Sequence, residues 1–228
     1  RPADLVEHFA MPIPSLVICE LLGVPYGDRA EFQALSTARF EMGDESPLDV
    51  IGTSLDYLGT LVERERADPG DGLLGQLIRE HGDELTDREL AGVADGILTG
   101  GHETTAASLS LGALALLQSP EYFAALGSAD ESTVHLAVEE LLRYLSVVQV
   151  AFPRFSRTPV RIGDVEIPAG QMVLVSLSGA DRDPVLGADP ERFDPTRPAT
   201  SHLGFGYGIH RCVGAELARI ELRIAFPA

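Results

Sequence analysis

The chain has 228 residues, a formal charge of -18 and a sequence pI near 4.6. This acidity argues against nucleic acid as a partner, because phosphates require a basic surface. No apolar run approaches the roughly 18 to 20 residues of a membrane-spanning helix, so no membrane association is expected. All 17 basic residues are arginine, and ten of them lie from Arg143 onward.

Helical periodicity predicts most of the first 145 residues. Apolar residues recur at helical spacing over residues 14–24, which end at a Gly and a Pro, and Cys19 in this run is predicted to be core. Asp28 is expected to cap a second helix that passes Phe40 and ends near Gly43. Two more helices are predicted over residues 48–66 and 73–81.

The longest predicted helix starts at Thr86-x-x-Glu89, a capping box, and ends at Ser119-Pro120. About 30 residues at 1.5 Å each give a length of roughly 45 Å. Its middle, residues 99–105 (TGGHETT), is weak, because the two adjacent glycines and the threonine pair at 104 and 105 cost about 2 kcal/mol of helix propensity. Two explanations are open. The glycines could allow a close helix crossing, or they could form a groove over a flat cofactor, with the Thr104 hydroxyl bonding the Gly100 carbonyl and opening the helix locally. His102 is interpreted as a packing or surface residue.

A further helix is predicted over residues 130–145, with Glu140 and Arg143 one turn apart on the same face. If exposed, this ion pair would contribute only a few tenths of a kcal/mol to the stability of the fold. Beyond it, short β-like runs at 152–155, 160–162, 165–167 and 172–177 predict a small sheet. Residues 189–198, with three prolines, form an irregular meander.

The stretch 202–214 (HLGFGYGIHRCVG) places Cys212 in a glycine-rich loop ahead of a predicted last helix over about residues 212–226. A helix N-terminus favours a thiolate. A buried cysteine and a phosphate loop are the alternative interpretations, but a phosphate loop would carry G-K-[ST] or G-x-G-x-x-G. A zinc site would need more thiols than Cys212 and the distant Cys19. A single thiolate as the only strong protein ligand fits haem iron. Two cysteines in such different settings form no disulfide framework, which favours a cytoplasmic location.

The pattern Phe205-Gly206-x-Gly208-x-His210-x-Cys212-x-Gly214 resembles the haem-binding signature of the cytochrome P-450 family. Residues 99–105 resemble the oxygen-activating segment of that family, and Glu140-x-x-Arg143 resembles its buried ion pair. The resemblance implies a mainly α fold with a small β region, truncated at both ends. It also implies one incomplete domain: helices to about residue 145, then sheet, meander and cysteine loop to 214, then the last helix. Family members are longer, so the chain is interpreted as an internal fragment.

The resemblance implies a role for each matching residue. Cys212 would ligate the iron of haem b (iron protoporphyrin IX), while Glu103 and Thr104 would be the catalytic acid and alcohol. Glu140 and Arg143, joined by Arg192 in preference to the alternative Arg197, would hold the cysteine loop. The implied cofactor-binding residues, with Arg154 and His210 contacting the haem propionates, are Gly100, Gly101, Thr104, Thr105, Arg154, Phe205, Gly206, His210, Cys212 and Gly214.

The implied activity is that of a haem-thiolate monooxygenase, which inserts one oxygen atom from dioxygen into a small apolar organic substrate. Electrons would come from a ferredoxin-type donor fed by a reductase and NAD(P)H, and Arg211, Arg219 and Arg223 could steer such an acidic partner. A monomer in the bacterial cytoplasm is expected. Two other functions are considered: a haem protein that senses or carries electrons, and an inert fragment without haem.

Overall fold

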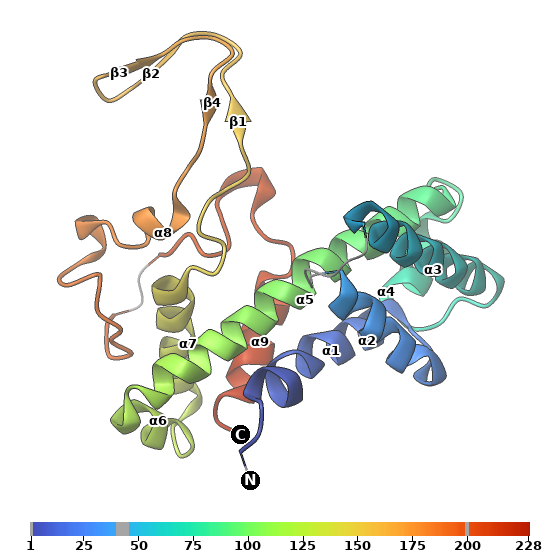
Figure 1. Ribbon diagram of the computed structural model, residues 1–228, viewed down its shortest axis with the longest axis horizontal. Coiled ribbons are helices and arrows are strands. Elements are labelled where there is room, and N and C mark those ends of the chain that lie inside the picture. Colours follow the sequence, from blue (N-terminus) through green and yellow to red (C-terminus); the bar gives the residue numbers. More distant parts are fainter. Residues whose placement is uncertain (1, 40–45, 199–200) are drawn as a thin grey trace. The chain divides into compact units, whose positions relative to one another are not determined.

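The computed structural model describes residues 2–39, 46–198 and 201–228. The expected helix end near Phe40 and Gly43 lies outside these residues. Within them the chain is mainly helical with a few short strands, as predicted (Figure 1). The helices are α1 (Pro12–Leu22), α2 (Arg29–Ala38), α3 (Pro47–Ala67), α4 (Leu73–His81), α5 (Asp87–Leu117), α6 (Pro120–Leu126), α7 (Glu131–Leu145), α8 (Leu177–Ala180) and α9 (Ala215–Ala225), and the strands are β1 (Arg154–Phe155), β2 (Val160–Ile162), β3 (Val165–Ile167) and β4 (Met172–Val173).

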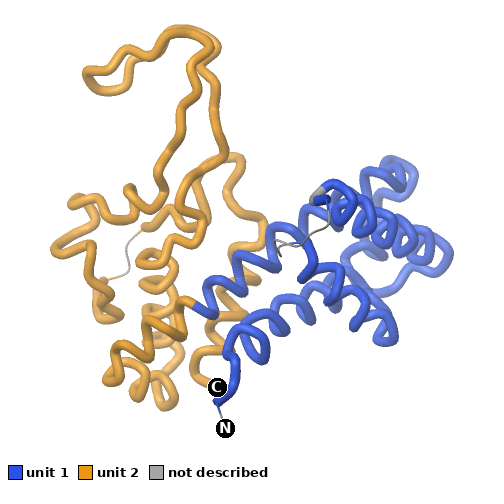
Figure 2. Tube along the Cα trace, in the orientation of Figure 1, with its two compact units in different colours: residues 1–110 blue, residues 111–228 orange. Residues whose placement is uncertain are grey.

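The chain divides into two compact units, residues 1–110 and residues 111–228 (Figure 2). The first unit contains α1 to α4 and most of α5. The second unit contains the end of α5 and all later elements. In the part of the chain that the structure describes, no helix combines the length and the apolar character needed to cross a bilayer.

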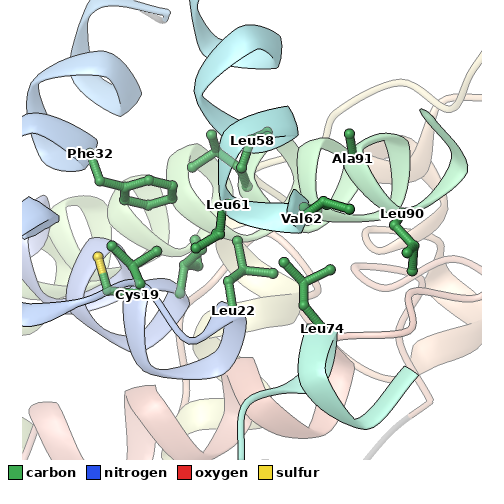
Figure 3. Packing of buried hydrophobic residues seen from close by; sticks show 13 residues of the cluster. Cys19, Leu22, Phe32, Leu58, Leu61, Val62, Leu74, Leu90 and Ala91 are labelled. Atoms are coloured by element: carbon green, nitrogen blue, oxygen red, sulfur yellow. The ribbon is translucent and has the colours of Figure 1, made fainter. Parts of the chain in front are cut away.

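The core of the first unit is a single apolar cluster to which five helices contribute (Figure 3). Leu22 of α1, Leu58 of α3 and Leu74 of α4 are completely buried in it, and Phe32 of α2 packs beside them. Cys19 is also fully buried, which confirms its prediction as a core residue. Burial raises the pKa of the Cys19 thiol to about 11, so this cysteine stays protonated at neutral pH.

The N-terminus of α5 is stabilised by the predicted capping box. The Thr86 N–H donates to the Glu89 carboxylate at 2.8 Å, and the Glu89 N–H donates to the Thr86 hydroxyl at 3.3 Å. Asp28 stands at the N-cap position of α2, as predicted, but its side chain makes no capping bond, because the residue ends a 3₁₀ turn and has helical backbone angles. Its carboxylate instead accepts a hydrogen bond from Arg64.

In the second unit, α7 packs against α9. The side chain of Asp130 caps α7 by accepting a hydrogen bond from the Thr133 N–H at 2.8 Å, so the helix predicted over residues 130–145 begins one residue later, at Glu131. The buried face of the helix is apolar except for two charged residues, and its apolar members are Val134, Ala137, Val138, Leu141 and Leu142. The two charged residues are Glu140 and Arg143.

The predicted small sheet forms as two separate antiparallel pairs. β1 pairs with β4, with Arg154 opposite Val173, and β2 pairs with β3, with Val160 opposite Ile167. Strands β1 and β4 are shorter than the runs 152–155 and 172–177 that the sequence favours. Pro153 offers no N–H to a ladder, which accounts for the late start of β1.

Candidate functional site

Two adjacent glycines in the middle of α5 face different surroundings. A Cβ added at Gly101 would lie 3.3 Å from Cδ1 of Ile18, so this glycine permits the close packing of α1 against α5. A Cβ added at Gly100 would meet nothing within 4 Å outside its own stretch of helix, among the residues that the structure describes. Gly101 therefore fits the helix-crossing explanation, whereas Gly100, like Gly92 and Gly96 earlier in α5, leaves backbone uncovered.

The polar residues of this segment separate in the same way. Glu103 is exposed and Thr104 is half-buried, one turn from Gly100. His102 and Thr105 are buried, which confirms packing for His102. The Thr104 hydroxyl donates to the Gly100 carbonyl at 2.5 Å, as predicted, but α5 continues as regular α-helix and does not open there. One strip of α5 thus presents Gly100, Glu103 and Thr104.

The cysteine loop precedes α9, as the sequence indicates. The Cys212 N–H donates to the carbonyl of Phe205 at 2.9 Å, which closes the loop on itself. Gly206 and Gly208 have φ values of 71° and 82°, a backbone conformation that favours glycine. Gly214 is the N-cap of α9, so Cys212 stands just ahead of the helix N-terminus.

The side chains around Cys212 are unusually exposed for their type. The cysteine itself is exposed, Val213 is 100% exposed and Ile209 is 97% exposed. Exposed apolar residues grouped around a thiol mark a surface that binds something. A flat, mostly apolar group that takes one thiolate ligand fits this donor set, and haem is such a group.

Behind the loop, Arg143 is almost completely buried and fully hydrogen-bonded. It forms a bidentate pair with Glu140, with Nε–Oε2 at 2.7 Å and Nη2–Oε1 at 2.9 Å. Its remaining hydrogens go to the carbonyls of Asp181, Pro190 and Arg192 at 2.7, 2.8 and 3.2 Å. The pair therefore stabilises the meander, which leads into the cysteine loop.

The third member of this group is Arg197, and the preference for Arg192 is corrected. Arg197 Nε donates to Glu140 Oε1 at 3.4 Å, and its two terminal nitrogens donate to the carbonyls of Ala188 and Asp189, where the meander begins. The side chain of Arg192 is exposed, and the residue takes part through its backbone carbonyl. The meander turns between the two arginines, and spacing alone does not show which of them points inward.

The implied propionate contacts, Arg154 and His210, are both exposed. Arg154 donates to the carbonyl of Phe152 at 3.1 Å, two residues earlier in the chain.

Of the three arginines expected to form a positive surface, Arg219 is held by Glu139 and Glu216, while Arg211 lies 3.9 Å from Glu216. Acidic neighbours thus offset much of the positive charge expected near the cysteine.

Two anchors of the loop were missed from the sequence. The buried carboxylate of Asp181 accepts hydrogen bonds from the Leu203 N–H at 2.6 Å and from the Ser146 hydroxyl at 3.0 Å. Glu139 accepts hydrogen bonds from His202 and Arg219. The adjacent glutamates 139 and 140 were a usable signal, because neighbouring helix positions point in different directions and can serve two separate contacts.

These features define a mainly helical protein with a supported, exposed cysteine loop in front of its last helix. A profile of the family described as Cytochrome P-450 matches residues 132–228. The whole chain is 44% identical to cytochrome P-450 FAS1 of Rhodococcoides fascians, covering 57% of that protein. It is also 44% identical to cytochrome P-450 monooxygenase PikC of Streptomyces venezuelae, with 99% of this chain and 55% of that protein covered.

Solved structures agree with these similarities. Cytochrome P-450 MoxA of Nonomuraea recticatena superposes with a TM-score of 0.92 at 40% identity, covering 100% of this chain and 57% of that one. The chain belongs to the cytochrome P-450 family. It spans less than two thirds of the length of these relatives. Members of this family hold haem through a cysteine thiolate.

Proposed function

We propose that the protein is a haem-thiolate monooxygenase that inserts one oxygen atom from dioxygen into a small apolar organic substrate. Family membership supports this function, and so does the relative named as a monooxygenase. The observation that carries most weight is the exposed thiol of Cys212, which lies among exposed apolar side chains. The loop that bears it is tied from behind by buried charged groups.

The residues of the chain fit haem b. Cys212 would be the iron ligand, Arg154 and His210 would contact the two propionates, and Phe205, Gly206 and Gly214 would allow the loop to lie close to the ring. On α5, the uncovered backbone at Gly100 and the neighbouring Thr104 would face the cofactor, while Gly101 and Thr105 would support this strip from within. When bound, haem with a thiolate ligand supplies the reductive splitting of dioxygen, because the thiolate donates electron density.

Glu103 and Thr104 would handle the protons that this reaction consumes. The Thr104 hydroxyl donates its hydrogen to the Gly100 carbonyl, so its oxygen is free to accept a hydrogen bond from a water molecule. The exposed Glu103 carboxylate, one residue away, can exchange protons with solvent. Together they can hold and pass protons through water by general acid–base catalysis.

The remaining components follow from the family. Electrons would come singly from a ferredoxin-type donor, itself reduced by a reductase with NAD(P)H. The protein would work as a monomer in the cytoplasm. These statements rest on the resemblance and, for the cytoplasm, on the different settings of the two cysteines, which form no disulfide framework.

A spectrum of the reduced, carbon monoxide-treated protein tests the thiolate assignment. We expect a Soret band far to the red of that of histidine-bound haem, and we expect Cys212→Ala to abolish it. Cys19→Ala is the matched control and should keep the band, because Cys19 is buried and protonated. A red-shifted band that survives Cys212→Ala would refute the assignment, and the absence of any haem band would favour the inert-fragment alternative.

A second measurement separates a monooxygenase from a haem sensor or electron carrier. In the full-length protein, Thr104→Ala should leave electron consumption largely intact but lower the share of electrons that appear in product. Unchanged coupling would remove Thr104 from the proposed mechanism. A sensor or carrier has no need for the Glu103 and Thr104 pair.

A further inference from the structure

Two consecutive glutamates on α7 bind different parts of the chain. Glu140 binds Arg143, Arg197 and the meander, as described above. Glu139 instead binds Arg219 of α9 and His202, the first residue of the cysteine loop. The second set of contacts connects α7 directly to the loop and to the helix that follows it.

The contacts of Glu139 are short and shielded from water. Arg219 forms a bidentate pair with it, with Nε–Oε1 at 2.6 Å and Nη2–Oε2 at 3.0 Å, and His202 Nε2 lies 3.2 Å from Oε2. The side chains of His202, Arg219 and Glu139 are only 3%, 12% and 16% exposed. Burial acts to raise the pKa of Glu139, but hydrogen bonds from His202 and Arg219 outweigh it and lower that pKa to about 2. Glu139 is therefore a carboxylate at any ordinary pH.

The hydrogen-bond roles of His202 are settled by its two partners. The Gly204 N–H donates to His202 Nδ1 at 3.1 Å, and a backbone N–H can only donate. Nδ1 must then accept, which places the ring hydrogen on Nε2, where it is donated to Glu139. His202 thus joins the backbone of the loop to α7 through opposite sides of one ring.

The same two side chains enclose Phe205. The ring of Phe205 lies 5.9 Å from that of His202, centroid to centroid, and the Arg219 guanidinium carbon lies 4.7 Å from its centroid. The carbonyl of Phe205 accepts the N–H of Cys212 at 2.9 Å. The position of Phe205 is therefore transmitted to Cys212 through one backbone hydrogen bond.

We propose that Glu139, His202 and Arg219 are positioning residues that set the place of Cys212 by holding Gly204 and Phe205. The link to cofactor binding rests on the proposed function, but the mechanical link does not. The proposal assigns separate tasks to the two glutamates: Glu140 holds the meander, and Glu139 holds the thiol-bearing turn. His202 acts through both of its ring nitrogens.

Hydrogen exchange of single amides in the 228-residue chain without haem tests this proposal. His202→Asn can still accept at the Nδ1 position but cannot reach Glu139, so the Gly204 amide should stay protected while the Cys212 amide exchanges about tenfold faster. His202→Gln can still donate to Glu139 but loses the acceptor, so the pattern should reverse. A role in packing alone would affect both amides alike in both variants.

Glu139→Gln keeps the shape of the side chain and removes its charge, and it should speed exchange at Cys212 by about tenfold or more. The matched control is Glu216→Gln, because Glu216 contacts the same arginine at 2.8 Å but is 72% exposed. That variant should leave the Cys212 amide unchanged. Unchanged exchange in Glu139→Gln and both His202 variants, or equal effects in Glu139→Gln and Glu216→Gln, would overturn the proposal. Because the protein carries no haem in this experiment, the result is independent of the spectrum that tests the proposed function.

Discussion

Gly100 in α5 and the glycines Gly206 and Gly208 in the cysteine loop all leave backbone uncovered, but they are held in different ways. The α5 segment is part of a continuous helix of 31 residues and is stabilised by its own hydrogen bonds. The cysteine loop forms short turns, with backbone hydrogen bonds at Gly206, Arg211 and Cys212, and it also depends on side chains from α7 and from the turn after α8.

The difference shows that an exposed backbone segment needs little support from other residues in a helix and much more in a loop. A helix tolerates one uncovered glycine because its ladder continues on either side. A loop with two residues at positive φ has no ladder, so its geometry must be imposed by partners. Buried charged groups such as Arg143 and Asp181 supply that support, and substitutions should therefore act more strongly on the loop than on the helix.

The largest effect is expected at the buried pair behind the meander. Glu140→Ala leaves Arg143 buried without its partner, which should cost about 3–5 kcal/mol of unfolding free energy in a urea titration. The control is Asp164→Ala, which breaks another pair three residues apart, Arg161–Asp164, that is 70% and 106% exposed. It should change stability by less than about 1 kcal/mol. Equal losses would contradict the dependence of the loop on buried support.

The next largest effect is expected in the pH dependence of the unfolding free energy, and it comes from Glu221 of α9. Burial raises the pKa of Glu221 to about 7 from its usual 4.5, and among the described residues its Oε2 has no hydrogen-bond partner. The folded state thus binds the proton more tightly than the unfolded state, and stability is lost as pH rises from 4.5 through 7. The loss should reach about 3 kcal/mol at pH 8.

Glu221→Gln should remove this loss, so the variant should be more stable than the parent at pH 8 and similar at pH 4.5. The pH dependence of stability that Glu139 contributes has the opposite sign to that of Glu221, because the pKa of Glu139 is lowered to about 2. Its contribution is complete above pH 4.5 and is lost as pH falls towards 2. Unfolding curves at pH 5 and pH 8 would contradict the assignment if Glu221→Gln had the same effect at both.

A smaller effect is expected in α5, and here a substitution should stabilise. Gly100→Ala should raise the unfolding free energy by about 1 kcal/mol, because alanine favours helix and a Cβ there meets nothing. Gly101→Ala should gain less, since its Cβ would press on Ile18 at 3.3 Å. Thermal unfolding of the two variants measures the difference. A larger gain for Gly101→Ala would show that the two glycines are not distinguished as described.

The smallest effect is expected for Asp181→Asn. The asparagine carbonyl can still accept the Leu203 N–H, and the amide can donate to the Ser146 hydroxyl, so the loss should be below about 1 kcal/mol. Asp181→Ala removes both bonds from a buried position and should cost about 2 to 3 kcal/mol. If the alanine variant matched the asparagine variant, Asp181 would not anchor the loop.

Most helices were predictable because their signals are local. The capping box at Thr86 and Glu89, the cap at Asp130 and the bond from Thr104 to Gly100 each join residues three or four positions apart. The position of Cys212 just ahead of a last helix was equally readable, because the glycines and the helical pattern are contiguous. Asp28 occupies the predicted cap position, but its carboxylate binds Arg64, a partner too far away in the sequence for a local pattern to indicate.

The sequence by itself determined the order of the elements, the place of Cys212 ahead of the last helix and the family to which the chain belongs, since each depends on residue types at short spacing. Only the tertiary structure decided that Arg197 and not Arg192 meets Glu140, and that Glu139 and Asp181 hold the cysteine loop. These contacts span from 22 to 63 residues, and their geometry depends on how the meander and α9 pack on α7. Spacing cannot specify such pairs, because any of several nearby charged side chains could reach the same buried partner.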